Sequence, residues 1–333
     1  MKLGLFAAVS VLSMMAASVA FALDQNLPAY QPAAGITGQL KSVGSDTLDR
    51  QMEAWAKGFQ RFYPEVKIEV EGRGSATAPE ALIEGAAQFG PMSRFMSAGE
   101  AEKFEKKFGY KVSSFRVSVD ALAIYVNKDN PVRCLSMEQA DRIFSSTRKG
   151  SGGRSIVTWG EAGLTGEWAS KPIVIYGRNS LSGTHDFFKQ IVLYDGDFKP
   201  EVNQEQNSEA VVQHVAGDKF AIGYSGIAFK TDGVRAAPLS VNPGGQLSVN
   251  PGGQCHNATL EETIGGKYPI ARYLYVYLNK KPDEQLDPLR AEFVKYILSR
   301  DGQALVEQEG YYSLTNEIRE AELRKLGLSP PER

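Results

Sequence analysis

The stretch KPIVIYGRNSLSGTHDFFKQIVL, from Lys171 to Leu193, decides the fold of this 333-residue chain. It begins with an apolar run typical of a buried strand, continues through a polar turn, and ends in a segment with helical spacing of apolar residues. Two earlier stretches, QLKSVGSDTL and KIEVEGRGSATAPEALIEGAA, follow the same order of strand, turn and helix. Repetition of this unit predicts an α/β fold.

The composition is that of a globular protein with two domains or lobes. The chain is 42% hydrophobic and 23% charged, and its formal net charge is −2. Its length is sufficient for two hydrophobic cores. The near-neutral charge provides no global basic field, so we expect neither a nucleic-acid partner nor attraction to an acidic membrane surface.

Residues 1–22 are predicted to be a secretory signal peptide. One Lys precedes an apolar run, and Ala20-Phe21-Ala22 fits the small-residue pattern before a cleavage site. A membrane anchor is the alternative, but the apolar core is short and no charged stop sequence follows it. We expect cleavage after Ala22, export to the periplasm or beyond it as a secreted protein, and an extended, Pro-rich arm at 23–38.

Export to an oxidising compartment favours a disulfide between Cys134 and Cys255, the two cysteines of the chain. It would close a long loop, a constraint worth at most about 4–5 kcal/mol in the chain-entropy model. Two free buried thiols are the alternative, because pairing cannot be read from a sequence alone.

The eight-residue unit LSVNPGGQ occurs twice without change between Leu239 and Gln254. Its Asn-Pro-Gly-Gly core is typical of a turn. Two copies are too few for a solenoid, so we expect an expanded surface loop.

Three strand-to-helix turns, with a fourth turn beside them, share a design that suits an oxyanion. Each would direct backbone N–H groups, small hydroxyls and the positive end of a helix dipole at one spot. Capping of helices by Ser and Thr is the alternative, but it explains neither the glycines nor Arg178, whose guanidinium can hold a tetrahedral anion bidentately. The turns are GSDTL (44–48), GSATAP (74–79), LSGTHDF (181–187) and GPMSRFMS (90–97).

An enzyme is an alternative class that the sequence argues against. The three histidines, His185, His214 and His256, lie far apart without metal-ligand spacing. There is no G-x-S-x-G elbow and no Walker A loop, and Ser182 with His185 lacks an orienting acid. We expect no catalysis, no metal and no cofactor. A surface adhesin is a third class, suggested only by the N-terminal arm and the repeat.

These stretches resemble the periplasmic phosphate-binding proteins of phosphate-specific ABC transporters, the PstS-like family. The likeness runs in order over nearly the whole mature chain and includes VGSDTL, GRGSATAP, GPMSRFM, VSVDALAIYVNKDNPV, GRNSLSGTHDFFK, GYSGIAFK and YPIARYLYVYLNKKP. It implies a type II periplasmic-binding-protein fold, with two α/β lobes, a ligand cleft and two crossover strands. Lobe one would comprise 39–126 and 271–333, and lobe two 127–270.

The resemblance also implies a function and a site. We expect a monomer that binds inorganic phosphate as its lobes close and then docks on the permease subunits of the transporter. The predicted phosphate site consists of Ser45, Asp46, Thr47, Leu48, Ser75, Ser93, Arg94, Asp120, Arg178, Ser182, Gly183 and Thr184.

Arg94 departs from the pattern of the family. Some members carry an aspartate at this position, which accepts a hydrogen bond from the proton of phosphate and so rejects sulfate. The nearest candidates here are Asp120, which follows a strand pattern that can hold it rigidly and is therefore favoured, and Asp46. The alternatives are a solvated loop or an interlobe salt bridge for Asp120 and a helix cap for Asp46. Sulfate, molybdate and a phosphonate are the alternative ligands.

Overall fold

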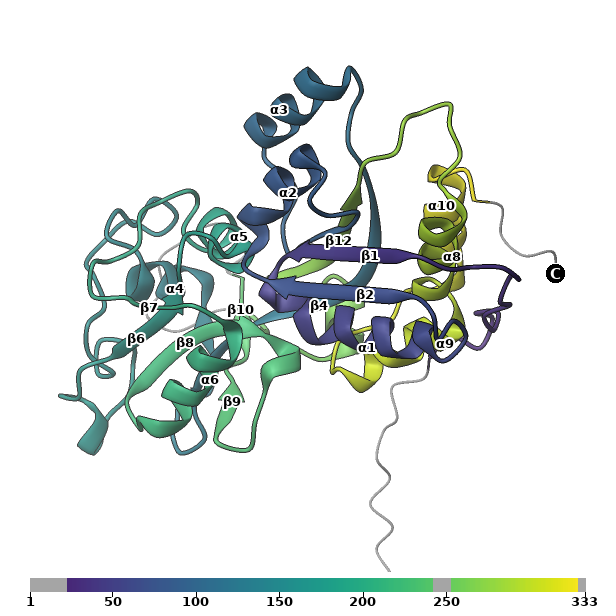
Figure 1. Ribbon diagram of the computed structural model, residues 1–333. Coiled ribbons are helices and arrows are strands. Elements are labelled where there is room, and N and C mark those ends of the chain that lie inside the picture. The colour runs from purple at the N-terminus through teal and green to yellow at the C-terminus, as the bar shows by residue number, and fades with distance from the viewer. Residues whose placement is uncertain (1–22, 242–252, 329–333) are drawn as a thin grey trace, which may run out of the picture.

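The computed structural model describes residues 23–241 and 253–328, which form a mixed α/β structure and confirm the predicted fold class (Figure 1). The strands are β1 (Gln39–Gly44), β2 (Lys67–Gly72), β3 (Gly90–Met92), β4 (Ser113–Asn127), β5 (Leu135–Ser136), β6 (Val174–Arg178), β7 (Asn203–Glu205), β8 (Ala221–Gly226), β9 (Val234–Ala236), β10 (Leu239–Ser240), β11 (Cys255–His256) and β12 (Ala271–Leu278). Within the described residues, the largest sheet has seven strands in the order β3-β12-β4-β8-β6-β7, with β9 paired to β4. Strands β1 and β2 form a parallel pair, and β11, β10 and β5 form a third sheet.

Most α-helices begin at a Ser, Thr, Asn or Asp whose side chain accepts a backbone N–H, as helix caps do. The α-helices are α1 (Asp49–Gln60), α2 (Ala78–Glu84), α3 (Ala98–Phe108), α4 (Met137–Phe144), α5 (Gly183–Ile191), α6 (Ser208–Gly217), α7 (Leu260–Ile264), α8 (Pro288–Ile297), α9 (Arg300–Gln308) and α10 (Asn316–Lys325). The 3-10 turns are η1 (Asp46–Leu48), η2 (Ser75–Thr77), η3 (Gly166–Trp168) and η4 (Ile227–Phe229). Helices α1 and α2 differ, because each continues from a 3-10 turn without a side-chain cap.

Strand β4 runs through the centre of the molecule and serves both halves of it. It pairs antiparallel with β12 as far as Ala121 and with β8 from Leu122 to Val126. The change of partner therefore lies inside one continuous strand, shortly before the predicted lobe boundary at 126/127. That boundary stays a prediction, and the names lobe one and lobe two are kept below for the predicted ranges.

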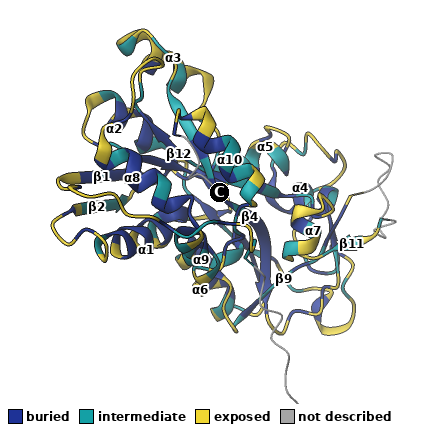
Figure 2. Cartoon of the chain, turned by 90° about the vertical axis from the view of Figure 1, so that its right-hand side faces the viewer, coloured by how far each residue is buried: buried dark blue, intermediate teal, exposed yellow. Residues whose placement is uncertain are grey.

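Alternation along β4 supplies two hydrophobic cores. Ala123 and Tyr125 pack in a cluster with helices α1, α8 and α9, whereas Leu122 and Ile124 pack in a second cluster with α4 and α5. Successive side chains of a strand point to opposite faces. Figure 2 shows β4 buried between the surrounding helices, whose outer surfaces are exposed.

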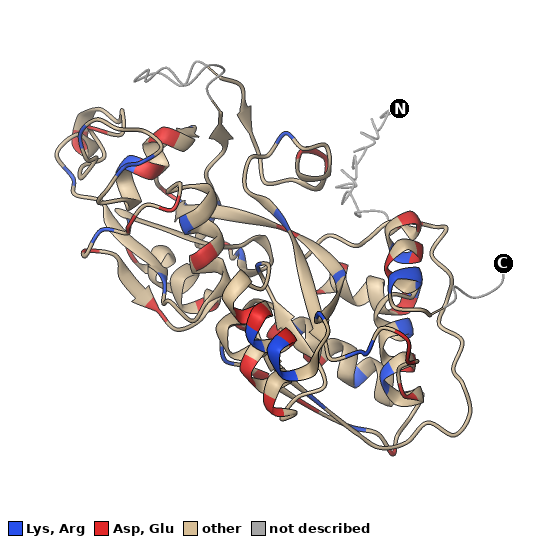
Figure 3. Cartoon of the chain, turned by 90° about the horizontal axis from the view of Figure 1, so that it is seen from above, with Lys and Arg blue, Asp and Glu red and all other residues tan. Residues whose placement is uncertain are grey.

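Figure 3 shows acidic and basic segments interleaved over the surface, consistent with the net charge of −2.

The arm at 23–38 contains neither helix nor strand and packs on the C-terminal part of the chain. Tyr30 is buried, and its hydroxyl donates to Glu292 Oε2 (2.7 Å) and contacts the hydroxyl of Tyr63 (2.8 Å). Burial raises the pKa of Tyr30, and the hydrogen bonds to Tyr63 and Glu292 raise it further. The arm is therefore anchored to the body of the protein, a contact that the sequence prediction of an extended arm did not include.

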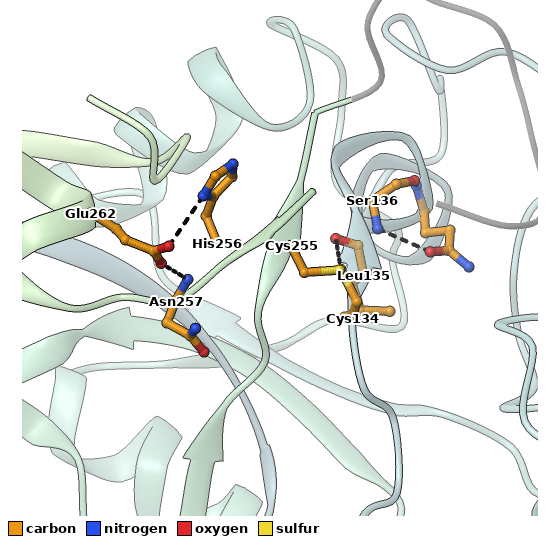
Figure 4. The surroundings of a disulfide bond; sticks show 8 residues. Cys134, Leu135, Ser136, Cys255, His256, Asn257 and Glu262 are labelled. Atoms are coloured by element: carbon orange, nitrogen blue, oxygen red, sulfur yellow. Dashed lines mark hydrogen bonds and ion pairs between the residues drawn. A yellow bond between two sulfur atoms is a disulfide. The ribbon is translucent and has the colours of Figure 1, made fainter. Parts of the chain in front are cut away.

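The predicted disulfide is present, joining Cys134 and Cys255 (Figure 4). Cys134 directly precedes β5, and Cys255 lies in β11. Since β10 lies between these two strands, the disulfide connects the outer strands of this small sheet.

Reduction of this disulfide is expected to lower the free energy of unfolding by about 2–4 kcal/mol, since the cysteines are 121 positions apart in sequence and the unfolded chain regains conformational freedom. Urea denaturation with and without reductant measures the change. The Cys134→Ser/Cys255→Ser variant is the control, because reductant should leave its stability unchanged. Equal stability of the oxidised and reduced protein would contradict the expectation.

Two predicted features fall wholly or partly outside the described residues. The signal peptide at 1–22 lies outside them, as do residues 242–252 of the repeated LSVNPGGQ unit. Among the residues that the structure describes, no helix is both long and apolar enough to cross a membrane.

Candidate oxyanion site between the lobes

The four predicted turns meet at one place between the two lobes. Thr47 Oγ1 of lobe one lies 3.1 Å from Thr184 Oγ1 of lobe two. Nearby, Ser45 Oγ donates to Ser93 Oγ (3.1 Å), and Ser75 Oγ lies 3.3 Å from the same atom. All five side chains are at most 1% exposed. Buried polar side chains are uncommon unless they are paired or functional, so this cluster of hydroxyls is a candidate binding site.

Helix capping accounts for only part of this cluster. Ser182 does cap α5, because its Oγ accepts the N–H of Thr184 (3.2 Å). Ser45 and Gly74, which precede η1 and η2, make no side-chain cap. The predicted ligand N–H of Leu48 donates to the carbonyl of Ser45 (3.1 Å) within the 3-10 turn. The hydroxyls of lobe one are thus placed by the turns without being used to cap a helix.

Arg178 ends strand β6 and is 1% exposed. Its Nη1 donates to Ser208 Oγ (2.7 Å), and its Nη2 donates to the carbonyl of Gln206 (2.9 Å). Its backbone N–H donates to the hydroxyl of Tyr224 (3.1 Å), whose pKa is raised by burial. These contacts fix a buried positive charge at the edge of the hydroxyl cluster.

Asp46 reaches this guanidinium from the other lobe. Its Oδ1 lies 2.8 Å from Arg178 Nη2, and its Oδ2 accepts from the N–H and Oγ of Ser208 (both 3.2 Å), the first residue of α6. Among the described residues, Asp46 Oδ1 makes this ion pair but no hydrogen bond, and Arg178 Nε has no hydrogen-bond partner. Arg178 Nε is therefore a buried donor that can serve an oxygen of a ligand, and Asp46 Oδ1 is held by its ion pair without a hydrogen-bond donor.

The lobes touch where glycine leaves room. A Cβ placed on Gly183 would lie 2.3 Å from Ser75 Oγ and 2.7 Å from Ser93 Oγ. Gly74 has a φ of +106°, which favours glycine, and a Cβ there would lie 2.5 Å from the carbonyl oxygen of Leu181. The N–H of Ala76 in lobe one also donates to this carbonyl (3.1 Å). The cleft between the lobes is thus closed by direct contacts.

Asp120 lies behind the hydroxyl cluster on β4 and is fully buried. Its Oδ2 accepts from Nε (3.0 Å) and Nη2 (2.8 Å) of Arg272, and its Oδ1 accepts from the N–H of Ile227 (3.1 Å). Arg272 in turn donates to Thr184 Oγ1 (2.8 Å) and to the carbonyl of Ser93 (2.8 Å). Asp120 is therefore buried in an ion pair within predicted lobe one, which differs from both alternatives to its role as a proton acceptor, the solvated loop and the interlobe salt bridge.

Arg94 follows Ser93 in sequence but turns toward the rim of the cleft. Its guanidinium pairs with Glu100 in lobe one and with Asp186 in lobe two. The structure thus brings the other predicted site residues together, directly or through Arg272, and directs the Arg94 side chain to carboxylates. No cluster of His, Cys, Asp and Glu that could hold a metal occurs among the described residues.

Comparisons with known proteins place the chain in a family. A model of the PBP superfamily domain matches residues 29–301. The phosphate-binding protein PstS of Pseudomonas aeruginosa is 46% identical over 313 residues, covering 94% of this chain and 94% of that protein. The PstS of Staphylococcus haemolyticus is 28% identical and covers 87% of this chain and 86% of that protein. This chain belongs to the PstS-like family.

Solved structures agree with the PstS-like fold. A substrate-binding protein of Clostridium perfringens, solved with bound phosphate, has a TM-score of 0.67 and 25% identity and covers 84% of this chain and 100% of that chain. An ABC-type phosphate transport receptor of Vibrio cholerae has a TM-score of 0.63 at 21% identity. The match covers 83% of this chain and 100% of that chain. The predicted type II periplasmic-binding-protein fold is confirmed.

Three residues of this PstS-like chain were missed by the sequence analysis. Arg272 had a detectable signal, because it alternates in phase with the buried Leu274 and Val276 of β12 and so places a charge on the buried face. Ser208 begins α6 with no distinctive motif. Tyr311 donates its hydroxyl to the carbonyl of Thr47 (2.6 Å), and nothing in the local sequence indicates this contact.

Proposed function

We propose that this chain captures inorganic phosphate between its two lobes and delivers it to the permease of an ABC-type phosphate importer. The observation that carries the proposal is the buried cluster of serine and threonine hydroxyls from both lobes beside the guanidinium of Arg178. Hydroxyl and guanidinium groups donate hydrogen bonds to a tetrahedral anion. The phosphate-binding names of the relatives support the same ligand.

The proposed mechanism is closure of the lobes around the anion. Thr47 and Ser75 approach from lobe one, and Arg178 and Thr184 from lobe two, so a bridging anion binds the closed form better and shifts the population toward it. A buried doubly charged ligand requires nearly every oxygen to be hydrogen-bonded. Several charge-assisted bonds of about 1.5–3 kcal/mol each suffice for micromolar affinity, about −8 kcal/mol, after ordering costs.

The proposal places the protein outside the cytoplasm as an exported monomer that acts without catalysis. The signal-like segment at 1–22 and the disulfide support export. Ser182 Oγ accepts the N–H of Thr184 as the cap of α5, a structural role that needs no catalysis. His185 Nδ1 lies 2.9 Å from Asp186 Oδ1, a carboxylate that the sequence analysis did not expect beside this histidine.

Uptake of radiolabelled phosphate at micromolar concentration tests the function. Cells that lack the gene should take up phosphate slowly, and the wild-type chain supplied on a plasmid should restore the rate. The Arg235→Gln variant, changed away from the site, should restore it as well. Full uptake in cells without the gene would argue against the proposed role.

We propose further that Asp46 accepts the proton of phosphate. The sequence favoured Asp120, but Arg272 and the N–H of Ile227 already engage both oxygens of that carboxylate. Asp46 Oδ1 is buried beside Arg178 and makes no hydrogen bond. Other tetrahedral oxyanions remain the second candidate class, because Arg94 stands where some family members carry the aspartate acceptor.

Asp46→Asn is expected to reduce the preference for phosphate over sulfate by about a hundredfold, because an amide no longer repels an unprotonated anion. Competition titrations with the two anions at neutral pH give the ratio of dissociation constants. The ratio still reports the preference if loss of the ion pair to Arg178 weakens the binding of both anions. Asp120→Asn is the matched comparison. A loss of preference in Asp120→Asn alone would return the role to Asp120.

A further inference from the structure

Arg94 is held firmly in lobe one. Its Nη1 and Nη2 donate to the two oxygens of Glu100 (both 2.8 Å), a bidentate pair, and Nη1 also donates to the carbonyl of Phe95 (2.9 Å). Glu100 is itself fixed at the start of α3, where it accepts the N–H of Ser97 (2.8 Å) in a capping box. This geometry gives the guanidinium a defined position.

The remaining nitrogen reaches across to lobe two. Arg94 Nε donates to Asp186 Oδ2 at 2.7 Å. The other oxygen of Asp186 lies 2.9 Å from His185 Nδ1. Burial acts to raise the pKa of Asp186, but His185 and Arg94 outweigh it and leave that pKa lowered. All three nitrogens of the Arg94 guanidinium are thus engaged by protein groups.

The position of Asp186 connects this ion pair to the anion site. Asp186 lies in the first turn of α5, two residues after Thr184, and this turn carries the hydroxyls and N–H groups that face lobe one. The Arg94 side chain is 12% exposed and that of Asp186 is 38% exposed, so the pair lies at the rim of the closed cleft rather than inside it. Opening of the lobes would separate its two members.

We propose that Arg94 is a positioning residue that holds α5 against lobe one and slows the release of bound phosphate, instead of contacting the phosphate itself. The inference rests on the proposed function for its ligand. The pair forms only when the lobes meet, so it stabilises the closed form, and ligand leaves only from the open form. Its effect is therefore expected in the dissociation rate and not in the association rate.

Arg94→Gln and Asp186→Asn test this proposal with inorganic phosphate as the probe. Each is expected to raise the phosphate dissociation rate about tenfold and to leave the association rate within about twofold in stopped-flow measurements. The double variant should release phosphate no faster than either single variant, because both changes remove the same contact. Asp197→Asn is the matched control. Asp197 follows α5 in sequence and pairs on the surface (3.0 Å) with Lys189 of α5, the helix that carries Asp186.

Three results would overturn the proposal. Additive effects in the double variant would mean that the residues act independently, and unchanged dissociation in both single variants would mean that the pair does not hold the closed form. Weak binding in Arg94→Gln with normal release in Asp186→Asn would make Arg94 a ligand of the anion. If Arg94→Gln fails to fold, two variants still provide the test, namely Asp186→Asn and Arg94→Lys. Lysine keeps the positive charge but lacks the planar guanidinium that makes the bidentate pair.

Failure of the proposed function gives a different outcome. If the wild-type protein does not bind phosphate, the ligand assignment falls, while closure can still be measured by X-ray scattering of the ligand-free protein. If phosphate does not drive closure, the closed form is that of the ligand-free protein, so Asp186→Asn should have a larger radius of gyration than wild type and Asp197→Asn should not. Equal radii in that case would overturn the positioning role of Arg94 independently of the ligand.

Discussion

Replacing Arg178 with glutamine is expected to weaken phosphate binding by about a hundredfold or more, because at least two charge-assisted hydrogen bonds of about 1.5–3 kcal/mol each are lost. The same change removes the cation that pairs with the buried Asp46. It should therefore also lower the free energy of unfolding by about 3–5 kcal/mol. Calorimetric titration with phosphate and urea denaturation measure the two effects.

Two further variants separate binding from stability. Arg178→Gln/Asp46→Asn removes the uncompensated charge and should recover part of the stability without recovering binding. Arg235→Gln is the control, because this part-buried arginine of lobe two donates from Nε to the carbonyl of Asn130 (3.0 Å). It should lose stability and keep its affinity for phosphate. Wild-type affinity in Arg178→Gln would contradict the proposed site.

Replacing Gly183 with alanine is expected to weaken phosphate binding by about a hundredfold while leaving the fold intact. The added methyl would lie 2.3 Å from Ser75 Oγ and 2.8 Å from Ser75 Cβ, so rotation of the hydroxyl alone cannot relieve the contact. The lobes must then stay further apart. Alanine is a better helix former than glycine, so the thermal midpoint of the ligand-free protein should be unchanged or slightly higher.

Gly217→Ala is the matched control for the methyl group added in Gly183→Ala. Gly217 ends helix α6 in the same lobe, and a Cβ there would meet nothing within 4 Å. Its phosphate affinity should equal that of wild type. X-ray scattering with saturating phosphate should show compaction of wild type and Gly217→Ala but less compaction of Gly183→Ala. Normal binding by Gly183→Ala would mean that the lobes do not close as tightly as in the structure.

Local patterns predicted the elements that form the fold. Met52, Trp55 and Phe59 recur at helical spacing and are fully buried on α1, whereas Phe62, which continues the stripe, lies beyond the helix end and is 40% exposed. The strand, turn and helix units were recognisable because the turns contain glycine and hydroxyl residues between two different apolar periods. The same units placed Ser75, Ser182 and Thr184 in the predicted site.

Contacts between the lobes could not be predicted in the same way. Asp46 pairs with Arg178, and Arg94 pairs with Asp186, across the contact between the two lobes. These pairs depend on how the lobes pack together, which no local stretch of sequence indicates. A helix-start aspartate has the same local sequence whether it caps its own helix or pairs across a cleft. Arg272 is different, because a charge in phase with the buried face of β12 predicts a buried partner, although not its identity as Asp120.

Titration calorimetry of the ligand-stripped protein with phosphate, sulfate and arsenate at neutral pH tests the central claim most directly. We predict micromolar or tighter binding of phosphate, about −8 kcal/mol or more favourable, binding of the near-isosteric arsenate, and no heat with sulfate. Comparable binding of sulfate would contradict the assignment of Asp46 as a proton acceptor and widen the ligand to other oxyanions. Absence of binding by all three anions would contradict the proposed function itself.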